Sequence, residues 1–508
     1  MKLTGFLFAA ALLGTCTQPD AEENYKRHVD PKIGTGGHGH VFVGANVPFG
    51  LVQVGPTSIP QTWDWCSGYH ASDSTVIGFS HTHLSGTGIG DLFDITVMPV
   101  VGEVTYARGE ENDPASGLWS YADRTREITK PGYYSVPLVR YGITAELTAT
   151  ERVGLHRYTF PASDAAAVVF DLENGGCWDK ATDTGFCFSD DSTRIAGWRC
   201  STGWAKNQEV YFVAEFSKPA KGISYLQPGE IDDSKMPRIA ARYARVDFDT
   251  AEGEQVLVKV ALSPVSIEGA KANLAAELPG WDFDATAAAA DKAWNDELSK
   301  VKIETEDETS KRIFYTALYH TMVAPSLFCD VNGDYRGADG KVHENPGRDT
   351  YTTFSLWDTY RAAMPLMTVL HPERMPDIIQ TMLHIADEQG RLPVWHLWGN
   401  ETDCMVGNPG IVAVADAIVK GIGGFDREKA FETIRKTAMN PDRGNGLRME
   451  YGYIPCEMFN EAVAYDMEYA LADGAAARAA EALGKAEDAK YFEERSHSYR
   501  NYFDPQTG

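Results

Sequence analysis

The sequence predicts a multidomain chain of the β plus α class, with an antiparallel β-sandwich first and helices second, and three observations support this. From residue 29 to about 265, short apolar runs alternate with period two and are separated by Gly, Pro, Asn and Asp. After the breaker Leu278-Pro-Gly280, an Ala-rich helical pattern runs from 286 to 300. Beyond residue 304 nearly every segment has helical periodicity. Since short loops join these helices, we expect them to pack as layers or as a toroid.

The strands are predicted where β-branched and aromatic residues alternate with polar ones. They cover 93–98, 134–139, 145–150, 167–171, 209–214 and 255–261. Helices are predicted near 307–324, 355–370, 374–388, 411–422, 427–438, 458–472, 474–484 and 487–502, with a hairpin at about 330–341. The predicted domains are a leader at 1–20, a sandwich domain at 21–282, a linker helix at 283–303 and a helical domain at 304–508.

The first twenty residues predict export. Lys2 is followed by an apolar run, 6–13, that is too short to span a bilayer as a helix, which takes about 20 residues. The run and the small residues after it are typical of a secretory signal, and Cys16 after Leu-Gly-Thr resembles a lipoprotein cleavage box. We therefore expect an exported protein, in the periplasm or at the outer membrane or cell surface, with Cys16 lipidated. Cleavage without lipidation is the alternative, and a lipid anchor is the only membrane contact that we expect.

The composition excludes one class of partner. Lys and Arg total 46 against 72 Asp and Glu, which gives a net charge of −26 over 508 residues. Such a chain repels the phosphate backbone, so nucleic-acid binding is not expected. The seven cysteines other than Cys16 contain no CxxC pair, so a structural zinc knuckle is not expected either.

Three short motifs are better explained by turns and buried side chains than by ligand sites. Residues 34–39 satisfy GxGxxG, but a β-branched segment that ends in Pro follows them instead of a helix. Residues 330–334 begin like a calcium loop, but the sixth and twelfth positions lack the Gly and Glu of an EF-hand. His81 and His83 would share one face of a strand. For these two we favour hydrogen-bonded imidazoles over a metal pair or a substrate contact.

Acidic residues of the helical half lie among aromatic ones in three places. The segment 357–361 places an Asp between Trp and Tyr, and 395–404 contains two Trp and two acids. Glu457, Glu461 and Tyr465 have the spacing of one helix face. Rings and carboxylates together are typical of a cleft that stacks a sugar and binds its hydroxyls. Solvated helix faces and ion pairs are the alternative interpretation.

Five longer motifs, in unbroken order from about residue 30 to the end, together resemble glycoside hydrolase family 92. They are Val47–Gln53, Gly78–Gly88, Phe354–Arg361, Leu397–Met405 and Tyr451–Pro455. The resemblance implies an N-terminal β-sandwich, a linker helix and an (α/α)₆ barrel, here incomplete because about eight helices are predicted instead of twelve. It also implies a calcium-dependent, inverting, exo-acting α-mannosidase that releases mannose from N-glycans or mannan.

The resemblance carries individual residues with it. Trp63 or Trp65 corresponds to a sandwich tryptophan at the barrel mouth, and Asp358 to the aspartate that binds the mannose hydroxyls. Substrate contacts are also expected of Asn400, Glu401 and Glu461. The family's motifs for the general acid and the base do not occur in the chain, so we assign no catalytic residue and expect that pair beyond residue 508. The calcium ligands are expected mostly outside the chain as well.

Two other functions fit parts of the sequence. A mannoside-binding lipoprotein would keep the Trp and Asp contacts without acid and base, and would bind glycans without hydrolysing them. A metallohydrolase built on His81 and His83 would bind zinc and lose its function on His83→Ala. If the resemblance to family 92 holds, mannose-containing glycans are the expected partners.

Overall fold

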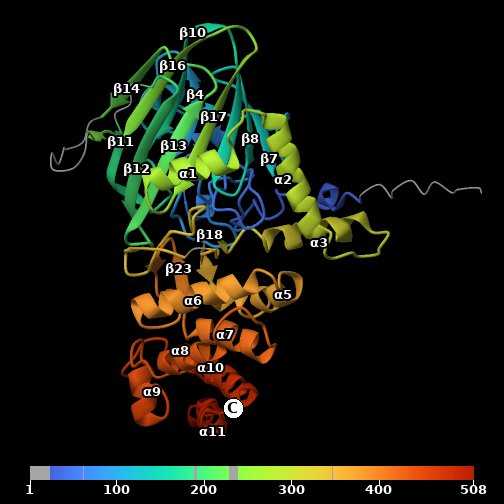
Figure 1. Cartoon of the computed structure of the whole chain (residues 1–508), viewed down its shortest axis with the longest axis vertical. Coiled ribbons are helices and arrows are strands. Elements are labelled where there is room, and N and C mark those ends of the chain that lie inside the picture. The colour runs from blue at the N-terminus through green and yellow to red at the C-terminus, as the bar shows by residue number, and fades with distance from the viewer. Residues whose placement is uncertain (1–22, 61, 188–190, 228–237, 346, 508) are drawn as a thin grey trace, which may run out of the picture.

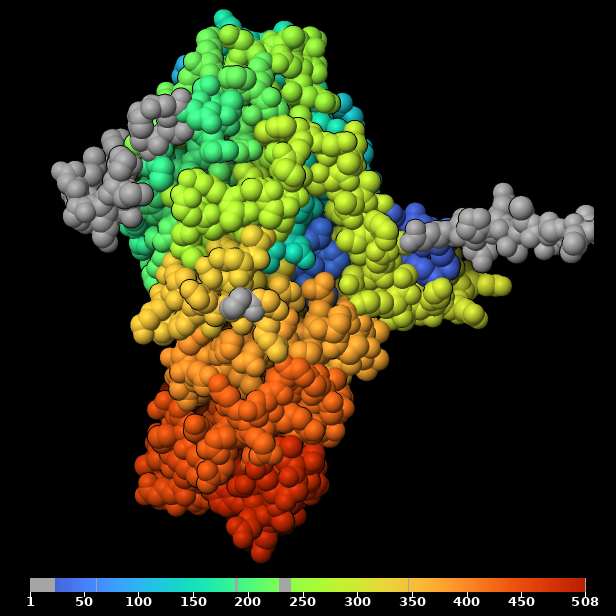
Figure 2. All heavy atoms as spheres, viewed as in Figure 1, coloured from blue at the N-terminus to red at the C-terminus, as the bar shows by residue number. Residues whose placement is uncertain are grey.

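The computed structural model describes residues 23–60, 62–187, 191–227, 238–345 and 347–507 (Figure 1). The predicted leader and Cys16 lie outside these residues. The strands occupy one end of the molecule and the later helices the other, as both the ribbon and the space-filling view show (Figures 1 and 2). No helix among the described residues combines the length and the apolar character needed to cross a membrane.

Two antiparallel sheets build the N-terminal half of the described chain. The six-stranded sheet has the order β1 (Gly55–Thr57), β3 (Gly78–Ser80), β4 (Thr96–Val101), β10 (Ser163–Asp171), β16 (Tyr243–Thr250), β14 (Gly222–Leu226). The nine-stranded sheet has the order β15 (Arg238–Ala240), β11 (Lys180–Cys187), β12 (Arg194–Thr202), β13 (Gln208–Phe216), β17 (Glu254–Ser263), β9 (Val153–Phe160), β8 (Ile143–Ala149), β7 (Tyr133–Leu138), β6 (Ile128–Lys130). A short pair, β2 (Thr75–Val76) and β5 (Ser120–Tyr121), lies beside them.

The two sheets face each other across a shared apolar core. Phe170 of β10 stacks on Phe212 of β13 with ring centroids 5.9 Å apart, and Phe79 of β3 stacks on Tyr158 of β9 at 6.2 Å. All four side chains are buried. Because inward-facing residues of both sheets meet in one core, the predicted β-sandwich is confirmed.

Two helices connect the sandwich to the rest of the chain. The helix α1 (Ile267–Glu277) packs on β17 and β13 and was not predicted. The helix α2 (Phe283–Leu298) corresponds to the predicted linker helix; its first turn is capped by the carboxylate of Asp282, which accepts the Ala285 N–H at 2.9 Å. The buried Trp294 of α2 donates its indole N–H to the Asn46 carbonyl at 2.7 Å, which fixes α2 against the sandwich.

The second half is helical, as predicted. Its helices are α3 (Glu308–His320), α4 (Leu356–Thr359), α5 (Ala363–Leu370), α6 (Met375–Gln389), α7 (Pro409–Val419), α8 (Arg427–Ala438), α9 (Asn445–Tyr451), α10 (Ala462–Ala482) and α11 (Ala486–Arg495). Short strands lie between them and the sandwich: β18 (Ser326–Leu327) with β21 (Tyr351–Thr352), β19 (Tyr335–Arg336) with β20 (Val342–His343), and β22 (Phe354–Ser355), β23 (Trp395–Leu397) and β24 (Asn400–Glu401). The pair β19–β20 is the predicted hairpin, shifted by a few residues.

Several helix predictions differ from the structure in their boundaries. The last, 487–502, covers α11 and a separate 3₁₀ turn, Ser498–Asn501. The predicted helices 458–472 and 474–484 are the single helix α10, which begins later and continues through Gly474. Glycine inside a helix costs only about 1 kcal/mol, and the alanines around it are buried. The predicted helix 355–370 is divided into α4 and α5, and α9 was not predicted at all.

Candidate functional site

The strands β22, β23 and β24 bring together residues that lie far apart in the sequence, at the junction of the two domains. They pair antiparallel, with Ser355 opposite Trp395 and His396 opposite Glu401. The helix α4, which carries Asp358, follows β22 directly. The small sheet therefore places three of the predicted substrate contacts, Asp358, Asn400 and Glu401, on one structural unit.

Asp358 presents an exposed carboxylate from α4. The hydroxyl of Ser355 donates to its Oδ2 at 2.6 Å, which orients the carboxylate. Ser355 does not bond the other oxygen, Oδ1. A carboxylate accepts hydrogen bonds at both oxygens, so such a group suits the hydroxyls of a sugar.

A second set of contacts fixes α4 from the other side. Glu468 of α10 accepts the Tyr360 hydroxyl at 2.9 Å and pairs with the Arg361 guanidinium at 2.8 Å. That guanidinium lies over the rings of Trp357 and Tyr360, 4.6 Å from each centroid. Burial and the hydrogen bond to Glu468 raise the pKa of Tyr360 to about 12, so its phenol is a permanent donor near neutral pH.

Glu401 is turned toward its own loop. Its carboxylate accepts the backbone N–H groups of Val394 at 2.8 Å, Trp395 at 2.9 Å and Asp403 at 3.0 Å. These bonds hold the β23–β24 hairpin together. Substrate contact by Glu401 stays a prediction, and the structure adds a structural role for this side chain.

Asn400 connects the hairpin to the sandwich. Its side-chain oxygen accepts the Asn207 N–H at 3.0 Å, and its amide donates to the Asn207 carbonyl at 2.9 Å and to the Trp398 carbonyl at 2.7 Å. Beside this pair, the ring of Trp204 meets the ring of Trp395 edge-on with centroids 4.6 Å apart. The loop that joins β12 and β13 thus reaches the helical domain.

Trp63 and Trp65 lie on the short 3₁₀ helix Trp63–Trp65 of the sandwich domain. Trp63 is 48% exposed and donates its indole N–H to the Gly88 carbonyl at 2.7 Å. Trp65 stacks on His70, with ring centroids 4.5 Å apart. Trp63 is the more exposed of the two, although the centroid of the His40 imidazole lies 4.2 Å from its ring centroid, and the contact of either tryptophan with a substrate stays a prediction.

The predicted helix face formed by Glu457, Glu461 and Tyr465 is wrong. The helix α10 begins at Ala462, and Glu461 precedes it as the N-cap with a φ of 55°. Glu457 therefore lies outside the helix, in the turns that follow α9. Glu461 itself is exposed, and its contact with substrate stays a prediction.

The histidines His81 and His83 are buried and hydrogen-bonded, which is the interpretation that the sequence favoured. His81 donates from Nδ1 to the Ile95 carbonyl at 2.7 Å, and its Nε2 lies 2.9 Å from Nε2 of His156. His83 donates from Nδ1 to the Gln53 carbonyl at 2.8 Å. Burial lowers the pKa of His81 to about 3 and that of His83 to about 4, so both are neutral near pH 7. Since both ring nitrogens of His81 have partners, the pair is not arranged as a metal site.

One cluster of acidic and histidine side chains among the described residues is close enough together to be compared with a calcium site. Its three potential metal-ligating residues have their ligand atoms within 4.8 Å of one another: Glu297, His371 and Glu373. The ammonium of Lys300 lies 2.8 Å from Glu297 and 3.0 Å from Glu373, so a cation already neutralises this group. Calcium prefers six to eight oxygen ligands, and a histidine nitrogen beside a lysine does not supply them. We therefore route no chemical step through calcium.

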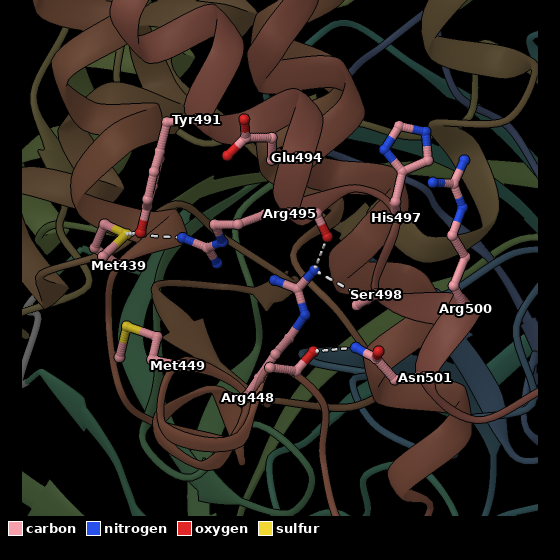
Figure 3. A pocket seen from close by; sticks show the side chains of 11 residues that line it. Met439, Arg448, Met449, Tyr491, Glu494, Arg495, His497, Ser498, Arg500 and Asn501 are labelled. Carbon is pink, nitrogen blue, oxygen red and sulfur yellow. Dashed lines mark hydrogen bonds between the residues drawn. The ribbon is translucent and has the colours of Figure 1, made fainter.

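A cavity of about 690 Å³ opens at the other end of the helical half, away from the junction (Figure 3). Its lining comes from the end of α8, from α9, from α11 and from the 3₁₀ turn Ser498–Asn501, and includes Arg448, Tyr491 and Arg495. None of the predicted site residues contributes to the lining that the described residues form. The junction sheet, and not this cavity, is therefore the candidate site.

Family models match both halves of the chain. The model described as the N-terminal domain of glycosyl hydrolase family 92 covers residues 28–263, and the model of its catalytic domain covers 269–508. The chain belongs to glycosyl hydrolase family 92. The family predicted from the five motifs is thus confirmed.

Solved structures of the family share its fold. A family 92 α-mannosidase from Bacteroides thetaiotaomicron in complex with mannoimidazole is 37% identical with a TM-score of 0.91, over 96% of this chain and 65% of that one. An inverting mannosidase of the same family and organism is 28% identical with a TM-score of 0.85, over 97% and 66%. A protein from Arthroderma benhamiae described as an uncharacterized secreted glycosidase is 26% identical over 95% of this chain and 63% of its own. The family 92 chain thus spans slightly less than two thirds of the length of these relatives.

Sequence reasoning missed the loop between β12 and β13, which contacts the helical domain at the junction. Trp204 and Asn207 lie in a Gly- and Ser-containing turn, and no motif sets that turn apart from the other loops of the domain. The only signal is a tryptophan in a loop, which is typical of many unrelated sites.

Proposed function

We propose that this family 92 protein is an inverting exo-acting α-mannosidase that acts on mannose-containing glycans such as N-glycans or mannan. The observation that carries the proposal is the match in fold and sequence to an α-mannosidase that binds mannoimidazole. The exposed Asp358 carboxylate at the domain junction supports it, because it is free to accept hydrogen bonds from sugar hydroxyls.

The residues of this chain would bind and orient the sugar. Asp358 accepts hydroxyl protons, Ser355 fixes the direction of its carboxylate, and Trp63 offers a half-exposed ring on the sandwich side. In an inverting enzyme a carboxylic acid protonates the leaving oxygen while a carboxylate about 6.5–9.5 Å away activates water on the opposite face. We assign neither of these two roles to a residue of this chain.

Three finer points belong to the same proposal. Calcium dependence follows from the family resemblance alone. Export is supported by the leader-like sequence and by a relative described as secreted. Lipidation of Cys16 rests on the sequence pattern at residues 13–16.

Mannose binding is the direct test of the site. We expect Asp358→Asn to weaken binding of mannose about tenfold to hundredfold, because a hydrogen bond to a charged acceptor contributes about 1.5–3 kcal/mol. Titration calorimetry with mannose, and with its epimer glucose as the ligand control, measures this. Asp387→Asn is the matched variant, since Asp387 is also an exposed aspartate of the helical half. Equal binding by the two variants would refute the role of Asp358.

A second candidate function is mannoside binding without hydrolysis. It would use the same exposed Asp358 carboxylate and half-exposed Trp63 ring as sugar contacts, without turnover. Release of 4-nitrophenol from an aryl α-mannoside, with calcium present, separates the two functions. Binding with turnover supports the mannosidase, and saturable binding with no turnover at high protein concentration supports the binding protein.

A further inference from the structure

The loop Gly203–Asn207 is held rigidly at its base by a buried carboxylate. Asp91 is fully buried, and its Oδ2 accepts the Ala205 N–H at 2.8 Å. The chain passes so close to this carboxylate that a Cβ at Gly203 would lie 2.4 Å from Asp91 Oδ1. A side chain is therefore excluded at this position, and the conformation of the loop is set by the sandwich.

The far end of the loop is fixed by the helical domain. Asn400 forms two hydrogen bonds with the backbone of Asn207, one in each direction. Because these bonds use the main chain of Asn207, they constrain the position of the loop and not merely that of a side chain. Trp204 lies between the two fixed ends, where its ring contacts Trp395.

From Trp395 the contacts continue to Asp358. Trp395 lies opposite Ser355 in the β22–β23 pair, and the Ser355 hydroxyl donates to Asp358 at 2.6 Å. A contiguous set of contacts thus leads from the sandwich loop to the candidate sugar-binding carboxylate. On its other side α4 is held by Glu468, so Asp358 is placed by elements from both domains.

We propose that Trp204 is a positioning residue, which acts through Trp395 to hold the strand β22, whose Ser355 orients Asp358 toward the sugar. The proposal rests on the proposed function, since it gives Trp204 a purpose only if a sugar binds at Asp358. It assigns part of the site to the sandwich domain, and it explains why a loop of that domain reaches across the junction.

The test combines binding with a local measurement. In Trp204→Ala we expect mannose to bind about fivefold more weakly, since aromatic pairs contribute about 0.5–1.5 kcal/mol beyond buried area. Backbone amides of 354–358 should exchange their hydrogens faster than in the unaltered chain. Trp204→Phe keeps a ring against Trp395 and should restore both values. Trp281→Ala is the matched control, because its ring lies 4.0 Å from the Lys259 ammonium within the first domain.

The outcomes separate this proposal from the proposed function. Unchanged exchange of 354–358 in Trp204→Ala overturns the positioning role. Weaker binding with unchanged exchange also overturns it and makes Trp204 a direct contact with the sugar. If the unaltered chain binds no mannose, the proposed function fails, while the exchange measurement still decides whether Trp204 holds the strand.

Discussion

Each domain buries one arginine between two aspartates, but the two clusters differ in charge balance. In the sandwich, Arg199 pairs with Asp94 at 2.6 Å and with Asp179, and Asp91 lies near them. In the helical half, Arg448 pairs with Asp466 at 2.8 Å and Asp473 at 2.5 Å, and Arg495 adds a second guanidinium 3.1 Å from Asp473. In the first cluster one guanidinium thus pairs with two carboxylates, while the nearby Asp91 is held by backbone N–H groups instead. In the second cluster two guanidinium groups face two carboxylates.

This difference indicates different roles for the two clusters. The balanced cluster joins α9, α10 and α11 and satisfies its charges internally. In the sandwich cluster, Asp91 Oδ1 and Asp179 Oδ2 are buried without a hydrogen bond from the described residues. Surplus buried charge is costly to maintain, and such groups concentrate at functional sites. The unbalanced cluster is also the one that supports the Trp204 loop at the domain junction.

Removing the guanidinium should have the largest effect. We expect Arg199→Met to lower the free energy of unfolding by about 3–5 kcal/mol, because it leaves several carboxylates buried without a cation. Arg448→Met should cost less, about 2 kcal/mol, because Arg495 still faces Asp473. Urea unfolding of both variants measures the difference. A larger loss in Arg448→Met would show that charge balance does not distinguish the clusters.

The pH dependence of stability should be the next largest effect. Burial raises the pKa of Asp91 from 3.8 to about 6. At pH values between 3.8 and about 6, folded Asp91 holds a proton that the unfolded chain has released. The stabilisation from this proton is therefore complete below pH 3.8 and is lost as the pH rises through about 6. The loss reaches about 3 kcal/mol at most. Asp91→Asn should remove that part of the slope in unfolding experiments from pH 4 to 7; an unaltered slope would contradict the shift.

Removal of divalent metal should have the smallest effect on stability. Among the described residues, the acidic and histidine side chains found close together, at Glu297, His371 and Glu373, are already neutralised by Lys300. We therefore expect EDTA to change the midpoint of thermal unfolding of this chain by less than about 1 °C. Calorimetry with and without added calcium measures this. A shift of several degrees would place calcium ligands within the chain, most simply around the unbalanced carboxylates of the sandwich.

Much of the fold was readable from the sequence, because the periodicity of apolar residues is local. The alternation in 209–214 predicted β13, and the Ala-rich pattern after residue 286 predicted α2. The failures occurred where local signals were weak. The helix α9 contains Gly446 and is followed by Gly452 at its C-cap, and the predicted break between 472 and 474 is absent because α10 continues through both positions.

The candidate site was predicted only in part. Asp358 and Asn400 were found through motifs; the structure places Asn400 on the small sheet and Asp358 on the helix α4 that follows its strand β22. For Glu401 the motif could not reveal that backbone N–H groups from its own loop surround the carboxylate. Glu461 was predicted to lie on a helix face because of its four-residue spacing from Glu457 and Tyr465. That spacing defines a face only within a helix, and α10 begins after Glu461.

The sequence by itself determined the class of each half, the surplus of negative charge and the family. These properties follow from residue types and short spacings, which need no knowledge of distant contacts. Only the tertiary structure decided that Trp204 contacts Trp395, and that Asp91 supports the loop that carries Trp204. Such contacts join residues about a hundred or more positions apart, and their partners are selected by how the packed domains meet.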